Sequence, residues 1–203
     1  MAEKKDLTGI ILGAGRGERM GGPKALLVIE GEPLYLRHVR RARLAGCGDV
    51  ILVTNREVAR ELPPEPGLRI VLSDEDETSG SVARGCTALG DAVVVLLTPV
   101  DVLPATTRTI ELLFQAIRDG AEAATPSFQG RGGHPVLCRR EVLSAYVAAP
   151  PFPTLRDALA RLGEKRVRVE VTDPHVTRDL NRPDDIWALT GAAPQFWKKS
   201  MLP

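Results

Sequence analysis

Short apolar runs that alternate with helical segments are the feature that most restricts how this chain can fold. The most continuous run, AVVVLL at residues 92–97, has no polar position and is typical of a strand buried on both faces. Another short run, at residues 7–12, ends at a glycine and predicts a second buried strand. Strands that alternate with helices predict a mostly parallel sheet with helices on both faces. We therefore expect a three-layer α/β/α fold.

The same patterns predict the limits of each element. Proline at the start of a helix and glycine after its end bound several of the helices. The expected strands are 7–12, 49–54, 68–72, 92–97, 121–125, 135–138 and 167–171. The expected helices are 33–45, 57–62, 81–89, 104–119, 140–147, 154–161 and 184–189. We expect residues 1–191 to form a single domain and residues 192–203 to be a loose C-terminal tail.

Charge and composition exclude several classes of protein. The 203 residues include 27 Lys and Arg against 26 Asp and Glu, and the net charge of +1 lacks the basic excess of a nucleic-acid binder. Three scattered cysteines, with no Cys-x-x-Cys pair, indicate neither a disulfide framework nor a zinc site. We find no secretory signal and no run of about 20 apolar residues that could span a membrane. We therefore expect a cytoplasmic protein that binds neither nucleic acid nor a membrane.

A glycine-rich string, ILGAGRGERMGGPKALL at residues 11–27, follows the first expected strand. Its glycines let the backbone adopt positive φ and approach a ligand closely, and successive backbone N–H groups can bind an anion. Cationic side chains in the same stretch suit a triphosphate. The glycines are Gly13, Gly15 and Gly17, and the cations are Arg16, Arg19 and Lys24. The alternative to a ligand-binding role is a purely structural one, a glycine-rich turn whose arginines are solvated.

Two common phosphate-binding motifs do not match this string. The Walker loop needs Gly-Lys-Ser/Thr, but Lys24 follows Pro23 and precedes Ala25. The dinucleotide motif needs a further glycine where Glu18 and Met20 stand, and no acidic residue ends the second expected strand. These mismatches argue against both a P-loop NTPase and a hydride-transferring dehydrogenase.

The whole string resembles the signature of the nucleotidyltransferase (NTP-transferase) superfamily, a LAAGxGxRMG-type loop followed by Pro-Lys. Within it, the likeness is strongest to the molybdenum-cofactor cytidylyl- and guanylyltransferases. Further matches keep the family's order: SGSVARG at 79–85, PVDVLP at 99–104, GRGGHPVL at 130–137 and DLNRPDD at 179–185. The family often has Thr where Arg182 stands here. The resemblance implies the Rossmann-like fold of nucleotide-diphospho-sugar transferases.

The resemblance also implies roles for individual residues. Asp101 follows the most buried expected strand, where a carboxylate can hold a magnesium ion (Mg²⁺), although by position alone it could be a turn residue or a helix N-cap. A second metal ligand is expected from Asp179 or Asn181, and which of the two binds directly is left open. His134 is expected in the acceptor pocket, and Arg84 near the site. The expected catalytic residues are Arg16, Lys24 and Asp101. The expected nucleotide-binding residues are Leu12, Gly13, Ala14, Gly15, Gly17, Arg19, Lys24, Asn55, Asp74 and Ser81.

The expected reaction is in-line attack by an acceptor phosphate on the α-phosphorus of a nucleoside triphosphate, with release of pyrophosphate. Such chemistry needs positioned cations and dipoles rather than a strong base. CTP or GTP is the favoured donor, and the molybdopterin cofactor the favoured phosphorylated acceptor. Sugar-phosphate or polyol-phosphate nucleotidyltransferases share the loop and remain an alternative, as does a nucleotide-binding module without catalysis. The sequence leaves the oligomeric state open.

Overall fold

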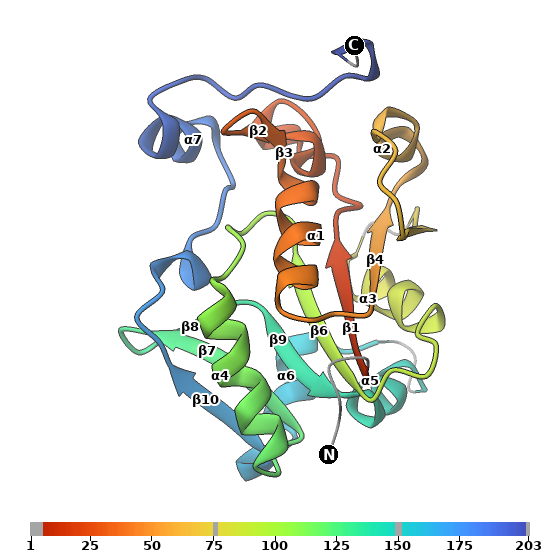
Figure 1. Ribbon diagram of the computed structural model, residues 1–203, viewed down its shortest axis with the longest axis vertical. Coiled ribbons are helices and arrows are strands. Elements are labelled where there is room, and N and C mark those ends of the chain that lie inside the picture. Colours follow the sequence, from red (N-terminus) through yellow and green to blue (C-terminus); the bar gives the residue numbers. More distant parts are fainter. Residues whose placement is uncertain (1–5, 75–76, 149–151, 202–203) are drawn as a thin grey trace.

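The central sheet is the frame on which the rest of the chain is arranged (Figure 1). A computed structural model describes residues 6–74, 77–148 and 152–201. Within these residues the strand order is β10-β7-β9-β6-β1-β4-β5, and β8 pairs with β7. The strands are β1 (Leu7–Leu12), β4 (Asp49–Thr54), β5 (Leu68–Leu72), β6 (Val94–Pro99), β7 (Ala123–Phe128), β8 (Arg131–Gly132), β9 (Val136–Arg139) and β10 (Arg166–Glu170). This order confirms the expected α/β class.

Most of the pairs that carry the site are parallel. Strand β1 is parallel to both neighbours, with Ile10 opposite Ile51 of β4 and Leu97 of β6. Strand β9 is antiparallel to β6 and β7. Since β1, β4 and β6 run in one direction, their carboxyl ends meet at the same edge of the sheet, where ligands bind in open α/β folds.

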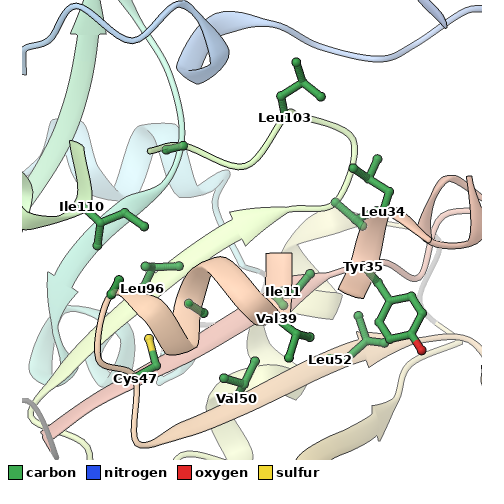
Figure 2. Packing of buried hydrophobic residues seen from close by; sticks show 14 of the residues in the cluster. Ile11, Leu34, Tyr35, Val39, Cys47, Val50, Leu52, Leu96, Leu103 and Ile110 are labelled. Carbon is green, nitrogen blue, oxygen red and sulfur yellow. The ribbon is translucent and has the colours of Figure 1, made fainter. Parts of the chain in front are cut away.

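Helices cover both faces of the sheet, as the apolar runs predict. Helices α1 and α4 pack on one face, and α3, α5 and α6 pack on the other (Figure 1). Figure 2 shows the first of these cores, where Val39 of α1 and Ile110 of α4 lie among side chains of the sheet. Full burial of such a side chain stabilises the fold by about 1.5–3 kcal/mol. The helices are α1 (Leu34–Leu44), α2 (Arg56–Glu61), α3 (Thr78–Thr87), α4 (Thr107–Arg118), α5 (Arg140–Val147), α6 (Leu155–Ala160) and α7 (Pro183–Thr190).

Two helices begin later than the prolines predict. Pro33 lies in a hairpin formed by β2 (Val28–Ile29) and β3 (Glu32–Pro33), which the sequence did not predict, and α1 starts after it. The hairpin turns through Glu30 and Gly31, both with positive φ. Helix α4 was expected from residue 104 but begins at Thr107, because the Thr106 hydroxyl accepts the Thr109 N–H at 3.3 Å and caps the helix there.

The expectation of a loose tail is wrong for residues 195–199. Val28 donates its N–H to the Gln195 carbonyl at 2.7 Å, and Trp197 donates to the Leu26 carbonyl at 2.7 Å. Leu27 and Phe196 therefore form an antiparallel bridge. Apolar residues at 196 and 197 explain this docking, since both pack against the core. The limits of a single domain, residues 1–191, stay a prediction. In the described residues, no helix is long and apolar enough to cross a membrane.

Candidate active site

The glycine-rich loop begins where β1 ends and is tied to the end of β4. Gly13 donates its N–H to the Val53 carbonyl at 2.7 Å, and the Thr54 hydroxyl donates to the Gly13 carbonyl at 3.1 Å. The Asn55 side-chain amide donates to the Ala14 carbonyl at 2.8 Å. The same side chain accepts the Val58 N–H at 2.8 Å and so caps α2. The end of β4 therefore fixes the path of the loop as it leaves β1.

A closed turn follows, and it depends on Gly17. The Gly17 carbonyl accepts N–H groups from Met20 at 2.8 Å and from Gly22 at 3.2 Å. Gly17 has a φ of 66°, and a Cβ atom there would lie 1.9 Å from the Gly22 carbonyl oxygen. A residue with a side chain is excluded on both grounds. The turn then continues through Pro23 into the short 3₁₀ helix η3 (Lys24–Leu26).

A pocket of about 550 Å³ lies beside this loop, at the carboxyl ends of β1, β4 and β6. This volume is within the usual range of small-molecule sites. Most residues expected to bind the nucleotide contribute to its wall: Leu12, Ala14, Gly15, Arg16, Gly17, Arg19, Lys24, Asn55, Asp74 and Ser81, together with Asp101 and Asn181. Gly13 is buried and is not among the wall residues. The wall also includes Glu18, Met20, Ser73, Glu77, Thr78, Pro99 and Val100, which the sequence did not single out.

Lys24 joins two segments that are far apart in the sequence. Its Nζ donates to Asp101 Oδ2 at 3.0 Å and to Asn181 Oδ1 at 2.7 Å. The Lys24 side chain is 15% exposed and that of Asp101 is 35% exposed, so the ion pair is only partly screened by water. A carboxylate oxygen and an amide oxygen thus both contact one ammonium group, at the carboxyl ends of the central strands.

Backbone pairing holds Asp101 and Asn181 together. Leu180 donates its N–H to the Asp101 carbonyl at 2.7 Å, and Val102 forms an antiparallel bridge with Asp179. The Asp185 carboxylate accepts the Asn181 N–H at 2.7 Å and the Arg182 N–H at 2.8 Å. These hydrogen bonds lower the pKa of Asp185. Asp185 therefore serves the first turn of α7 and also fixes the backbone of Asn181.

His38, on the inner face of α1, supports the segment that carries Asp101. Its Nε2 lies 3.0 Å from the Val102 carbonyl oxygen, and the ring is buried. Burial lowers the pKa of His38 to about 4, and the hydrogen bond to Val102 only partly opposes this effect. The ring is therefore neutral at pH 7 and donates its Nε2–H. No signal in the sequence distinguishes His38 from an ordinary residue on the inner face of a helix.

His134 and Asp179 lie beside the pocket rather than in its wall. His134 donates its N–H to the Val176 carbonyl at 2.8 Å, and its ring Nδ1 is buried without a hydrogen-bond partner in the described residues. Burial lowers the pKa of His134, and the Asp101 and Asp179 carboxylates oppose the shift. His134 thus interacts electrostatically with both carboxylates. Asp179 is exposed.

The remaining candidates divide between the wall of the pocket and its surroundings. Ser81 is buried in α3 with its hydroxyl 3.3 Å from that of Ser73, and both line the pocket. Asp74 also lines the pocket and is exposed. Arg84 is exposed on α3 and is not among the wall residues. The site thus combines a loop of glycines and cations with a carboxylate and an amide that converge on Lys24.

This fold and site define a nucleotidyltransferase. Residues 9–168 match the family described as the MobA-like NTP transferase domain. The chain belongs to that family, which confirms the resemblance of its loop.

Known relatives agree with this assignment. The chain is 33% identical to the molybdenum cofactor guanylyltransferase of Serratia proteamaculans (strain 568) over 166 residues, which cover 80% of this chain and 78% of that protein. The crystal structure of an Rv0371c homologue from Mycobacterium sp. strain JC1 has a TM-score of 0.76 and 26% identity, covering 91% of this chain and 94% of that one. A nucleotidyl transferase from Methanothermobacter has a TM-score of 0.72 at 19% identity, covering 91% and 96%, and so shares the fold.

Proposed function

We propose that this protein transfers a GMP group from GTP to the phosphate of a molybdopterin-type cofactor and releases pyrophosphate. The observation that carries the proposal is the convergence of Asp101 and Asn181 on Lys24 beside the glycine loop. The relative named a molybdenum cofactor guanylyltransferase, which matches 80% of this chain, favours GTP over CTP. An acceptor phosphate oxygen attacks the α-phosphorus, and the bond to the bridging oxygen of pyrophosphate breaks. No strong base is needed, because the acceptor phosphate is already ionised at neutral pH.

The chain's own cations neutralise the charge that grows on the leaving pyrophosphate. Lys24 has three N–H donors, and Asp101 and Asn181 use two of them, which leaves one for a phosphate oxygen. Arg16 and Arg19 are exposed on the loop at the rim of the same pocket and reach the outer phosphates. Donors that are already in place when charge develops are worth most in such a reaction.

The residues present fit a divalent cation such as Mg²⁺. Mg²⁺ is usually held by one or two protein oxygens together with waters and substrate phosphates, so it does not need a cluster of acidic side chains. Asp101 and Asn181 supply a carboxylate and an amide oxygen that already share one cationic partner. When bound, the ion neutralises phosphate charge and orients the triphosphate. Asn181 is the better second ligand, because it contacts Lys24 in the pocket whereas Asp179 lies outside its wall.

The acceptor is proposed to lie on the side of Asp101 where His134 and Asp179 stand. The buried Nδ1 of His134, which has no hydrogen-bond partner among the residues that the structure describes, supports this role, because such an atom in a native structure needs a partner. A neutral imidazole can hydrogen-bond a pterin or a phosphate without adding a second positive charge to the site. Substitution of His134 by Gln is expected to raise the KM for the acceptor and to leave that for GTP unchanged.

A nucleotide screen followed by a turnover assay tests the function. Thermal unfolding is measured with GTP, CTP, UTP and ATP, each with Mg²⁺; a ligand at 100 times its Kd stabilises the protein by about 2.7 kcal/mol. Pyrophosphate release is then followed with molybdopterin cofactor, and with sugar 1-phosphates as the competing acceptors. Stabilisation and turnover with UTP and a sugar phosphate would replace the proposal with its alternative. Tight binding without turnover on any acceptor would indicate a non-catalytic module.

A further inference from the structure

The C-terminal segment crosses the part of the molecule that carries the glycine loop. After α7 the chain runs past the β2–β3 hairpin towards α2 (Figure 1). We call residues 195–199 the strap. Its backbone pairs with the segment just after Lys24, through the Val28 N–H to the Gln195 carbonyl and the Trp197 N–H to the Leu26 carbonyl. The strap therefore adds a third extended segment beside the hairpin, on the side of the loop.

The strap touches the loop itself through Phe196. A Cβ atom placed on Gly22 would lie 2.9–3.0 Å from three carbon atoms of the Phe196 ring, so the ring lies directly on the Gly22 backbone. Gly22 in turn closes the turn with Gly17: its N–H donates to the Gly17 carbonyl, and its own carbonyl leaves no room for a Cβ at Gly17. Phe196 thus lies against the turn at Gly22, while residues 17–20 of the same turn line the pocket.

The far end of the strap is anchored on another support of the loop. Lys199 donates its backbone N–H to Glu61 Oε2 at 3.0 Å, at the end of α2. Helix α2 is capped by Asn55, whose side-chain amide donates to the Ala14 carbonyl. The strap therefore bridges the two structures that limit the loop, the turn at Gly17–Gly22 and helix α2. A single proline separates Gly22 from Lys24, so movement of Gly22 also displaces the Lys24 backbone.

We propose that Phe196 is a positioning residue for nucleotide binding, which acts by holding Gly22 and thereby the loop and Lys24 in the binding conformation. The inference rests on the proposed function for its choice of ligand. It assigns the strap no contact with the nucleotide. If removal of the ring leaves the loop in its binding conformation only about a tenth of the time, the apparent Kd rises about tenfold.

The strap contains its own reporter. The sequence has two tryptophans, Trp187 and Trp197. Trp187 is 56% exposed on α7, whereas Trp197 is half-buried in the strap and packs against the core. In a Trp187→Phe protein, Trp197 alone reports the strap. Coupling between the loop and the strap predicts that Mg²⁺-GTP makes the Trp197 fluorescence less accessible to a small quencher such as acrylamide, because such coupling is reciprocal and a loop held by nucleotide also stabilises the docked strap. Equal quenching of Trp197 with and without saturating Mg²⁺-GTP contradicts the inference.

Substitution of Phe196 tests the inference directly. Phe196→Ala is expected to raise the KM for GTP about tenfold with kcat within about twofold, the pattern of lost binding rather than lost chemistry. Phe196→Leu, which keeps an apolar group over Gly22, is expected to restore most of the loss. Hydrogen exchange of a peptide covering residues 13–24 should be faster in Phe196→Ala and near normal in Phe196→Leu. Unchanged exchange in the Ala variant would overturn the inference, and this measurement needs no nucleotide.

A double-variant cycle isolates the contact between the ring and the glycine. Gly22→Ala places a methyl group against the ring and is expected to weaken GTP binding about tenfold. Combining it with Phe196→Ala removes the clash, so the double variant should bind GTP better than the sum of the two losses predicts. Strictly additive losses contradict the contact. If the parent protein binds no nucleotide at all, the proposed function fails, while the hydrogen-exchange result still decides the role of Phe196.

Discussion

The Lys24 ammonium lies 3.0 Å from the Asp101 carboxylate, across 77 positions of sequence. Because this pair is partly exposed, we expect it to contribute only about 0–1 kcal/mol to stability. We propose that the pair matters mainly for the reaction. Lys24→Met and Asp101→Asn should each lower turnover by about 10²–10³, the usual effect of removing one preorganised charge-stabilising group. Pyrophosphate release and thermal unfolding are measured on the same samples.

A matched control for these variants is the exposed ion pair of Arg108 and Glu111 on α4, 3.8 Å apart. Arg108→Ala should leave turnover and melting temperature unchanged. Near-normal pyrophosphate release by both Lys24→Met and Asp101→Asn would show that the pair is structural only.

Asn55 was predicted to bind the nucleotide, but both the amide nitrogen and the oxygen of its side chain form hydrogen bonds within the protein. It donates to the Ala14 carbonyl and accepts the Val58 N–H, each at 2.8 Å. We therefore expect Asn55→Asp, which keeps the cap of α2 but cannot donate to Ala14, to weaken binding of all four nucleoside triphosphates by a similar factor of about ten. Asn55→Ala should in addition lose about 0.5–2 kcal/mol of stability with the cap.

The nucleotide screen separates the two roles of Asn55. A support for the loop changes affinity for every nucleotide alike, whereas a base contact changes the order of preference among them. A reversal of the GTP and CTP affinities in Asn55→Asp would restore the original prediction.

Asp185 is expected to matter for catalysis although it lies outside the pocket. Its carboxylate accepts the N–H groups of Asn181 and Arg182 and so fixes the residue that contacts Lys24. Asp185→Ala should lower kcat about tenfold through misplacement of Asn181. Asp184→Ala is the control, since this neighbouring carboxylate is exposed and favours α7 only through the helix dipole, by about 0.3–1 kcal/mol. Equal loss of activity in both variants would indicate a general effect on α7.

The sequence predicted the parts of the fold that depend on local pattern. The apolar run at residues 49–54 and the helix at residues 140–147 have the expected limits, because each is fixed by its own residues and close neighbours. The β2–β3 hairpin and the docked strap were missed. Each depends on pairing between short segments that carry little pattern of their own, and the strap pairs Phe196 with Leu27, far away in the chain.

For the candidate site too, local motifs were predicted from the sequence and tertiary contacts were not. Motifs identified Lys24, Asp101 and Asn181, but no pattern showed that one ammonium would join the other two. Supporting residues were harder to find. In the sequence, His38 looks like any residue on the inner face of a helix. Its hydrogen bond to the Val102 carbonyl joins two distant segments and cannot be predicted from local pattern. The three motif residues could be found because they match a family string, whereas the supporting residues act through tertiary contacts that no string records.

Asp173 is a buried carboxylate that joins the start of α4 to the segment before α7. Its oxygens accept the Thr106 N–H at 2.6 Å, the Thr109 hydroxyl at 3.0 Å and the His175 N–H at 3.1 Å. Burial alone raises the pKa of Asp173, but these hydrogen bonds together outweigh burial and lower the pKa below its ordinary value of 3.8. The charged form is therefore the one that the folded protein stabilises.

Asp173→Asn should accordingly destabilise the protein by about 1.5–3 kcal/mol at pH 7, the range for hydrogen bonds to a charged group. Because the folded-state pKa is lower than the unfolded one, this difference is fully present above about pH 4 and disappears as the pH falls through the folded-state pKa. Urea unfolding of both proteins between pH 7 and pH 3 measures it. Asp119→Asn, at the exposed other end of α4, serves as the control for the loss of one carboxylate from the same helix. The prediction is wrong if the difference in free energy of unfolding between wild type and Asp173→Asn stays constant down to pH 3. The carboxylate would then stabilise the fold through its shape and not through its charge.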